Sequence, residues 1–221
     1  MAKLSTKAIV ALFMVYLFWG GTYVGIKLGL TAFPPLGMAA IRHSIAGLIM
    51  LGTALIRKER WPSRQEAITS MIIGVLMLTI GNGLVTLAEK TVPSAVVSLL
   101  IGAVPLWIIL LNWGFGDRKT PTIFALLGVL MGLMGIAVLV FSSQSDTSFT
   151  FSWLGIGLVM TAALSWASGS LLSRYGKLPS SALMNLAIQM LTGGITLALL
   201  SAGRGEWADF TLSSVTPTAL W

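Results

Sequence analysis

The chain has 221 residues, of which 56% are hydrophobic and 10% are charged, and its mean hydropathy is +0.90. A soluble domain carries about 25% charged residues, so this composition excludes an ordinary soluble protein and favours a membrane protein with several spanning helices. Cysteine is absent, which excludes disulfide frameworks, thiolate metal sites and cysteine nucleophiles. The net charge of +7 is compatible with nucleic-acid binding or with basic cytoplasmic loops, and the positions of the basic residues distinguish the two.

Long apolar runs bounded by charge or proline predict seven membrane-spanning helices. They cover residues 8–30, 36–56, 68–88, 92–114, 121–142, 151–173 and 181–202. The first run is longer than the apolar core of a signal peptide and has no small-residue cleavage site after it, so we interpret it as a retained helix. Prolines mark the starts of later helices, at Pro34-Pro35, Pro93 and Pro121. The predicted fold class is therefore an all-α integral membrane protein.

Basic residues are distributed unevenly between the predicted loops. If the N-terminus is cytoplasmic, two basic residues, Lys90 and Arg204, lie in outer segments, and ten lie in inner segments. The ten are Lys3, Lys7, Arg57, Lys58, Arg60, Arg64, Arg118, Lys119, Arg174 and Lys177. The positive-inside rule favours this orientation, and the bias explains the basic pI without any nucleic acid.

A short internal repeat relates two distant parts of the chain. Residues 18–51 align without a gap to residues 165–198, an offset of 147, with six identities in 34 positions. The aligned pairs are Trp19 with Trp166, Lys27 with Arg174, Gly29 with Gly176, Leu36 with Leu183, Ala40-Ile41 with Ala187-Ile188, and Gly47 with Gly194. The offset equals five predicted helices, so the second copy enters the membrane from the opposite side. Such inverted repeats are common among secondary transporters, which bind substrate at the repeat interface.

The repeat divides the chain into two units. The first covers residues 1–142 with five predicted helices, and the Ser-rich stretch from Ser142 to Phe151 follows it as a linker. The second covers residues 151–221 with two predicted helices, after which Thr216 to Trp221 is typical of the start of an eighth. Three helices are missing from a plan of five plus five, so we expect the chain to be truncated at its C-terminus.

Five short motifs carry a family resemblance. They are Phe18 to Tyr23, Pro34-Pro35 followed by Ala40-Ile41-Arg42, Gly81-Asn82-Gly83-Leu84 leading to Ala88-Glu89, Val104-Pro105-Leu106, and Ser165 to Ser170. Their combination resembles the EamA type of the drug/metabolite transporter superfamily. The resemblance implies ten helices in two inverted repeats, a bacterial inner-membrane location, and export of small metabolites or drugs through a central cavity. The family pattern includes helices eight to ten, which this chain lacks.

Two polar residues lie deep in predicted helices. Arg42 is about seven residues into the second helix, roughly 10 Å from its end, and an intramembrane charge usually faces a partner or a wet cavity. It either lines a cavity and attracts an anionic substrate group, or bonds a helix-end carbonyl. Asn82 lies at about the same depth in the third helix, where it either hydrogen-bonds substrate or packs closely between Gly81 and Gly83.

Four aromatic residues lie inside predicted helices rather than at their ends, namely Trp19, Tyr23, Trp107 and Trp166. Lipid-facing packing explains any one of them. A repeat-related pair such as Trp19 and Trp166 favours a central cavity, where aromatic faces bind apolar or cationic groups. Gln189 occupies the repeat position of Arg42, so symmetry predicts that both residues enter this cavity from opposite sides.

Three further residues are candidates for gating or coupling. Glu89, at the outer end of the third helix, is either a solvated carboxylate or a gate paired with Arg42 or Lys27. His43 is the only histidine and cannot form a metal site alone, so it is either a packing residue or a proton relay. Pro105 removes a backbone hydrogen bond inside the fourth helix and predicts a kink, which is either a hinge or a feature of shape.

These observations favour a secondary transporter that works by alternating access around a central cavity. Its expected partners are a small-molecule substrate and the lipid bilayer, with no nucleic acid, no cofactor and no metal, and a homodimer is left open. The alternative is a truncated membrane fragment without transport activity. An intramembrane enzyme is a third, disfavoured class, because the apolar segments carry no HExxH motif and no buried pair of aspartates. Substrate identity, coupling ion and direction of transport do not follow from the sequence.

Overall fold

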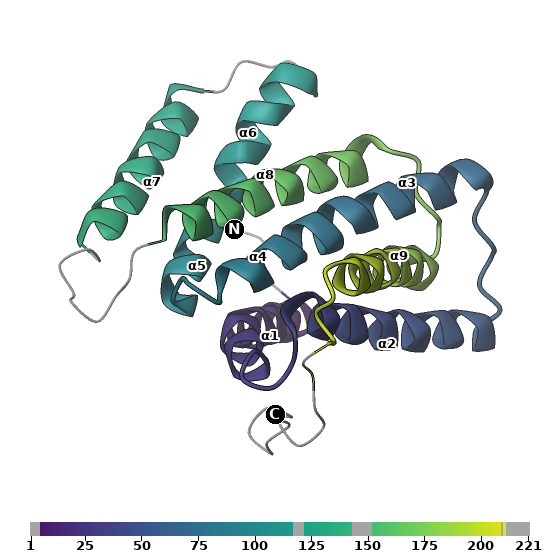
Figure 1. Ribbon diagram of the computed structural model, residues 1–221. Helices are drawn as coiled ribbons and strands as arrows, with labels where there is room; N and C mark the ends of the chain where they lie inside the picture. The colour runs from purple at the N-terminus through teal and green to yellow at the C-terminus, as the bar shows by residue number, and fades with distance from the viewer. Residues whose placement is uncertain (1–4, 117–121, 143–151, 209, 211–221) are drawn as a thin grey trace.

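The computed structural model describes residues 5–116, 122–142, 152–208 and 210, and all regular structure among them is helical (Figure 1). The helices are α1 (Thr6–Gly29), α2 (Pro35–Ile56), α3 (Arg64–Gly74), the π-helix η1 (Val75–Asn82), α4 (Gly83–Ala88), α5 (Ser94–Ile101), α6 (Val104–Phe115), α7 (Ile123–Ser142), α8 (Trp153–Tyr175) and α9 (Ala182–Gly203). Of the linker predicted from Ser142 to Phe151, residues 143–151 lie outside the described residues, as does the helix start expected at 216–221.

Among the described residues, six helical stretches are long and apolar enough to cross a membrane. Two of them are composite: α3, η1 and α4 run continuously from Arg64 to Ala88, and α5 and α6 cover Ser94 to Phe115. The seventh stretch is α7, with 20 residues. These bounds lie within a few residues of the predicted ones, and the all-α class is confirmed for the described part of the chain. The fourth stretch is interrupted at Gly102 and Ala103, just before Pro105.

Serine side chains cap several helix starts, where the first backbone N–H groups have no partner within the helix. The Ser63 hydroxyl accepts from Glu66 N at 3.4 Å while Ser63 N donates to Glu66 Oε2 at 2.7 Å, a capping box at the start of α3. Ser181 accepts from Met184 N at 3.2 Å at the start of α9. The start of α2, at Pro34-Pro35, has no such cap nearby in the sequence.

Glycines allow α2 and α9 to pack closely along their lengths. A Cβ on Gly194 would lie 2.4 Å from Ser44 Oγ, and a Cβ on Gly47 would lie 2.9 Å from the backbone nitrogen of Leu191. Small residues at such an interface allow the two helix backbones to approach each other directly. Figure 1 shows α9 beside α2 on one side of the composite α3–η1–α4 helix, and α8 on its other side.

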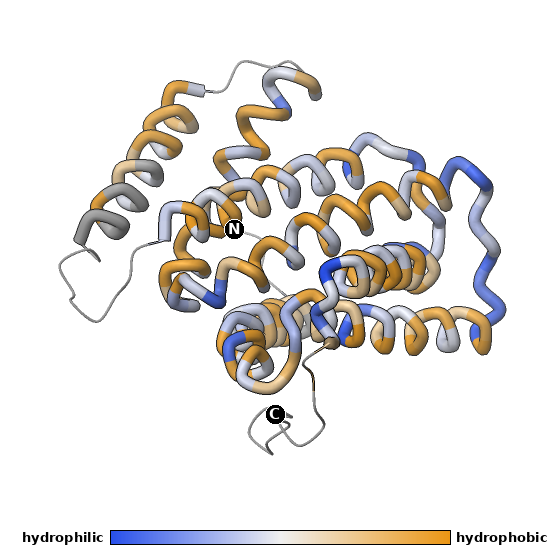
Figure 2. The backbone as a smooth tube through the Cα atoms, in the orientation of Figure 1, coloured by the Kyte–Doolittle hydropathy of each residue, from blue (hydrophilic) through white to orange (hydrophobic). Residues whose placement is uncertain are grey.

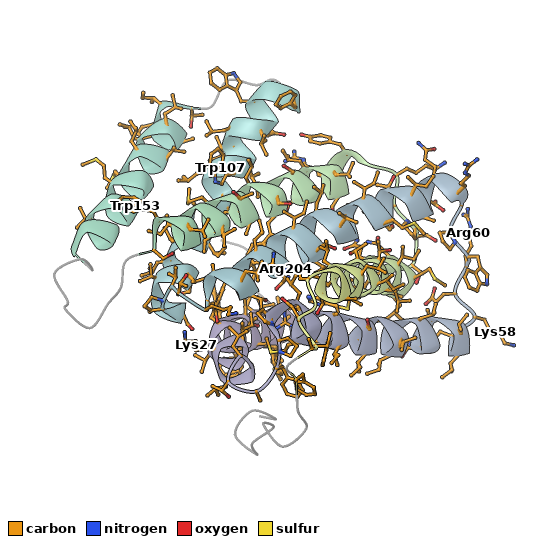
Figure 3. The ribbon with its side chains drawn as sticks, in the orientation of Figure 1. Lys27, Lys58, Arg60, Trp107, Trp153 and Arg204 are labelled. Carbon is orange, nitrogen blue, oxygen red and sulfur yellow. The ribbon has the colours of Figure 1, made fainter. Side chains whose placement is uncertain are left out.

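The largest buried cluster lies where α1, α4, α5 and α8 meet, and it is entirely aliphatic except for Tyr23. The outward faces of the bundle are also apolar, and Figure 2 shows hydrophilic residues concentrated in the connection between α2 and α3. In Figure 3, Lys58 and Arg60 lie in that connection, and Lys27 lies far from it, near the C-terminal end of α1. On α1, Tyr16 and Phe18 are 75% and 70% exposed, which suits contact with lipid or with another helix.

Candidate functional site

A cavity of about 300 Å³ lies among α1, η1, α4, α6 and α8. Most of its wall is apolar. The polar or aromatic side chains that line it are Trp19, Thr22, Tyr23, Asn82, Trp166 and Ser170. Its size and its few polar groups on an apolar wall are typical of small-molecule sites.

The π-helix packs against α8, and two of its backbone carbonyls accept hydrogen bonds from α8 side chains. Met77 O accepts the Trp166 indole N–H at 2.5 Å, and Leu76 O accepts the Ser165 hydroxyl at 2.7 Å. A Cβ on Gly81 would lie 2.3 Å from Trp166 Nε1, so only glycine admits the indole at this position. The irregular helix and Gly81 therefore fix Trp166 in the cavity wall.

Asn82 connects the cavity to α2. Arg42 Nη2 donates to Asn82 Oδ1 at 3.3 Å, and Asn82 Nδ2 donates to Met77 O at 3.4 Å. The amide orientation is unambiguous, because an arginine can only donate and a carbonyl can only accept. Arg42 does not line the cavity, but its charge lies directly behind the amide that does.

On α1, Trp19 and Tyr23 are one helical turn apart and interact with each other. Trp19 Nε1 donates to Tyr23 Oη at 3.3 Å. The Tyr23 side chain is buried, whereas Trp19 is 57% exposed. Both rings line the cavity together with Thr22 and Ile26.

A second polar cluster surrounds Glu89, which follows the last residue of the third span. Lys27 Nζ donates to the backbone carbonyl of Glu89 at 2.7 Å, not to its carboxylate. The side chain is fully buried, and neither carboxylate oxygen has a hydrogen-bond partner among the described residues. Burial raises the pKa of Glu89 to about 7, although the positive charge of Lys27, the nearby Ser94 side chain and the positive charge of Arg42 oppose the shift.

Four of the seven residues predicted for a cavity line this one: Trp19, Tyr23, Asn82 and Trp166. Arg42 reaches it through Asn82. Trp107, on α6 (Figure 3), packs against the aliphatic cluster, and its buried Nε1 has no partner among the described residues. Gln189 lies on α9, where its Nε2 donates to Asn185 Oδ1 at 2.9 Å, and Ser70 Oγ of α3 donates to the same oxygen at 2.8 Å.

The gating and coupling candidates are dispersed. His43 is buried on α2, and its Nε2 has no partner within the described part of the chain. Pro105 is the second residue of α6, directly after the break that separates α6 from α5. Glu89 alone combines burial with nearby charges from two other helices. The functional roles of all three residues stay predictions.

Sequence reasoning missed Thr22, Ser170 and Glu206. The first two had a signal, because Thr22 and Tyr23 follow Trp19 at the third and fourth positions, and Ser170 follows Trp166 at the fourth. Residues at that spacing share one helix face. No sequence signal pointed to Glu206, because its partners lie about 170 residues away. Its Oε2 accepts from Leu36 N at 3.0 Å and Gly37 N at 3.1 Å.

The sequence matches the EamA-like transporter family over residues 6–141. YedA of Escherichia coli (strain K12), named as an uncharacterized inner membrane transporter, is 34% identical over 197 residues, which cover 89% of this chain and 62% of the relative. YoaV of Bacillus subtilis (strain 168), named as an uncharacterized transporter, is 25% identical over 169 residues, or 76% of this chain and 57% of the relative. The chain thus spans about three fifths of the length of these curated relatives.

Proposed function

The chain belongs to the EamA-like transporter family, and from this membership and the cavity we propose that it exports or exchanges small metabolites or drugs across the bacterial inner membrane. The six apolar helices in the described part of the chain and a relative named as an inner membrane transporter agree with a multi-pass protein of that membrane. The observation that carries the proposal is that Trp19 and Trp166, which the internal repeat relates, line the same cavity. Secondary transporters bind substrate at such repeat interfaces.

The proposed mechanism is alternating access, in which the unit at 1–142 and the unit that starts at 151 rock about the cavity. Helices α1 and α8 begin the two units and supply residues to its wall. Pro105, beside the break between α5 and α6, is the proposed hinge, because tighter turn hydrogen bonds replace the α-helical ones at Gly102 and Ala103 and Pro105 has no N–H to donate.

Glu89 is the proposed gating or coupling group. A cytoplasmic N-terminus, which the distribution of basic residues favours, would put Glu89 and Lys27 at the outer end of the bundle. A buried carboxylate between two cations can exchange a proton as the outer side opens and closes. His43, one residue from Arg42, is the alternative relay, and exchange without a coupling ion is also compatible with the cavity.

The proposal is tested by transport in proteoliposomes that contain the 221-residue chain. The probes are radiolabelled amino acids, aromatic carboxylates and aromatic amines, offered outside vesicles preloaded with the same unlabelled compound. We compare Ser170→Trp, which fills the cavity from α8, with Thr161→Trp, which places the same bulk on an exposed position of the same helix.

We expect at least one probe to accumulate by exchange, Ser170→Trp to abolish the accumulation, and Thr161→Trp to preserve it. Equal accumulation by the chain and by protein-free vesicles would reject transport by this chain and favour the fragment without activity. Exchange that survives Ser170→Trp unchanged would place the path outside this cavity.

A further inference from the structure

The hydrogen bonds inside the cavity leave mainly donors for a ligand. Trp166 Nε1 is bound to Met77 O at 2.5 Å, and the Thr22 hydroxyl donates to Phe18 O at 2.8 Å. Those two protons are therefore already used. The polar groups that remain for a ligand belong to Asn82, Tyr23 and Ser170.

Asn82 lines the cavity and keeps one amide proton for a ligand. Its Oδ1 accepts from Arg42, and one of its two amide protons points to Met77 O, so the second amide proton is the group left for a ligand. Arg42 is a positioning residue in this arrangement, because it holds the amide in the orientation that donates.

Tyr23 also keeps a proton for a ligand. Its oxygen accepts from Trp19 Nε1, which is a donor only, so the phenolic proton stays available. The Ser170 hydroxyl makes no hydrogen bond within the described residues and can serve either as donor or as acceptor. The cavity therefore offers two fixed donors and one adaptable hydroxyl.

The charges around the cavity also favour an acceptor group over a cation. Among the described residues that line it, none is acidic or basic. Arg42 lies behind the Asn82 amide, and the Glu89 carboxylate, which interacts electrostatically with Tyr23, is accompanied by Lys27 as well as Arg42. One negative group between two positive groups leaves no net attraction for a cation at this end.

We propose that the cavity selects small molecules that join an apolar or aromatic body to a hydrogen-bond acceptor group, a carboxylate or a carbonyl, placed against Asn82 and Tyr23, and that it rejects organic cations. The apolar body would lie against the indoles of Trp19 and Trp166. This inference rests on the proposed function only in naming the bound molecule as substrate, since binding can be measured without transport.

The test uses three probes with one phenyl body and different head groups: 3-phenylpropanoate, its methyl ester and 3-phenylpropylammonium. Their dissociation constants for the full chain in lipid nanodiscs are measured by calorimetry at neutral pH. We expect the carboxylate or the ester to bind about tenfold or more tightly than the ammonium, because each acceptor gains hydrogen bonds that the cation cannot make. A carboxylate preferred over the ester would show that the Arg42 charge contributes, and equal binding would show selection by hydrogen bonding alone.

Two variants address the donors directly. Asn82→Asp replaces the donating amide with a carboxylate beside Arg42 and should reduce or reverse the preference. Asn112→Asp is the matched control, because Asn112 Oδ1 accepts from Tyr175 at 2.6 Å outside the cavity and a carboxylate can do the same. Tyr23→Phe removes one donor with little change of volume and should weaken the carboxylate more than the ammonium.

Tighter or equal binding of the ammonium by the unmodified chain would overturn the inference, and so would no binding of any probe. An unchanged ratio of the carboxylate and ammonium affinities in both Asn82→Asp and Tyr23→Phe would also overturn it. A chain that binds in the expected order but fails to move any probe in vesicles would contradict the proposed function and leave the inference standing. A chain that exchanges cations through the cavity would contradict this inference and leave the proposed function standing.

Discussion

At the scale of single residues, Glu206 supplies the cap that α2 lacks in its own sequence. Its Oε2 accepts from Leu36 N, Gly37 N and the Ser201 hydroxyl, at 3.0, 3.1 and 2.8 Å. A carboxylate at a helix start also interacts favourably with the helix dipole. The ring of Trp207 lies over Gly37, where a Cβ would come within 2.4 Å of it. The segment after α9 is thereby attached to the start of α2.

We predict that Glu206→Ala destabilises the folded chain by about 1–3 kcal/mol, because two backbone donors of α2 and one hydroxyl lose a charged acceptor. Thermal unfolding in detergent measures the loss as a lower Tm. Glu59→Ala is the control, since the Glu59 carboxylate makes no hydrogen bond or ion pair within the described residues. Equal Tm values for the two variants would contradict the capping role.

The sequence predicted some residue contacts and could not predict others. Arg42 and Asn82 were placed at one depth from helix lengths alone, and the structure joins them by a hydrogen bond. Gln189 was assigned to the cavity by symmetry with Arg42, but its side chain donates to Asn185, which in turn accepts from Ser70 of α3. A weak repeat predicts how deep in the membrane a residue lies, whereas the side of the helix that faces the cavity depends on packing.

At the scale of elements, the helix positions followed from the sequence but the type of one helix did not. Apolar runs and prolines located every described span, because about 20 apolar residues are needed to cross a bilayer. The π-helix Val75–Asn82 is as apolar as its neighbours and gave no local signal. It depends on side chains from α8, Ser165 and Trp166, which bond the released carbonyls of Leu76 and Met77.

We predict that Gly81→Ala disrupts this contact. The new Cβ would lie 2.3 Å from Trp166 Nε1, so the indole must leave Met77 O and the cavity wall must shift, at a cost of about 1–3 kcal/mol. Gly20→Ala is the matched control, because a Cβ there meets no atom within 4 Å. A lower Tm and weaker binding of 3-phenylpropanoate are expected for Gly81→Ala alone. Unchanged stability and affinity would show that the indole is not fixed at Gly81.

At the scale of the whole molecule, the described helices enclose a cavity whose wall comes from both predicted units. The all-α class, the membrane-spanning helices and the family followed from composition, apolar runs and motifs, because these features are local in the sequence. The cavity required the structure, because it depends on how α1 and α8 pack around the composite third span. The repeat-related indoles Trp19 and Trp166 were the part of the cavity that the sequence could indicate.

The most direct test of the account is whether water reaches this cavity in the membrane. The chain has no cysteine, so Ser170→Cys and Thr161→Cys each provide a single thiol on α8, the first in the cavity and the second on an exposed face. A membrane-impermeant maleimide is applied to vesicles of each orientation, with and without 3-phenylpropanoate. We predict that Ser170→Cys is labelled and is protected by the ligand, while Thr161→Cys stays unlabelled in lipid. A Ser170→Cys thiol that no reagent reaches from either side would contradict the cavity as a transport path.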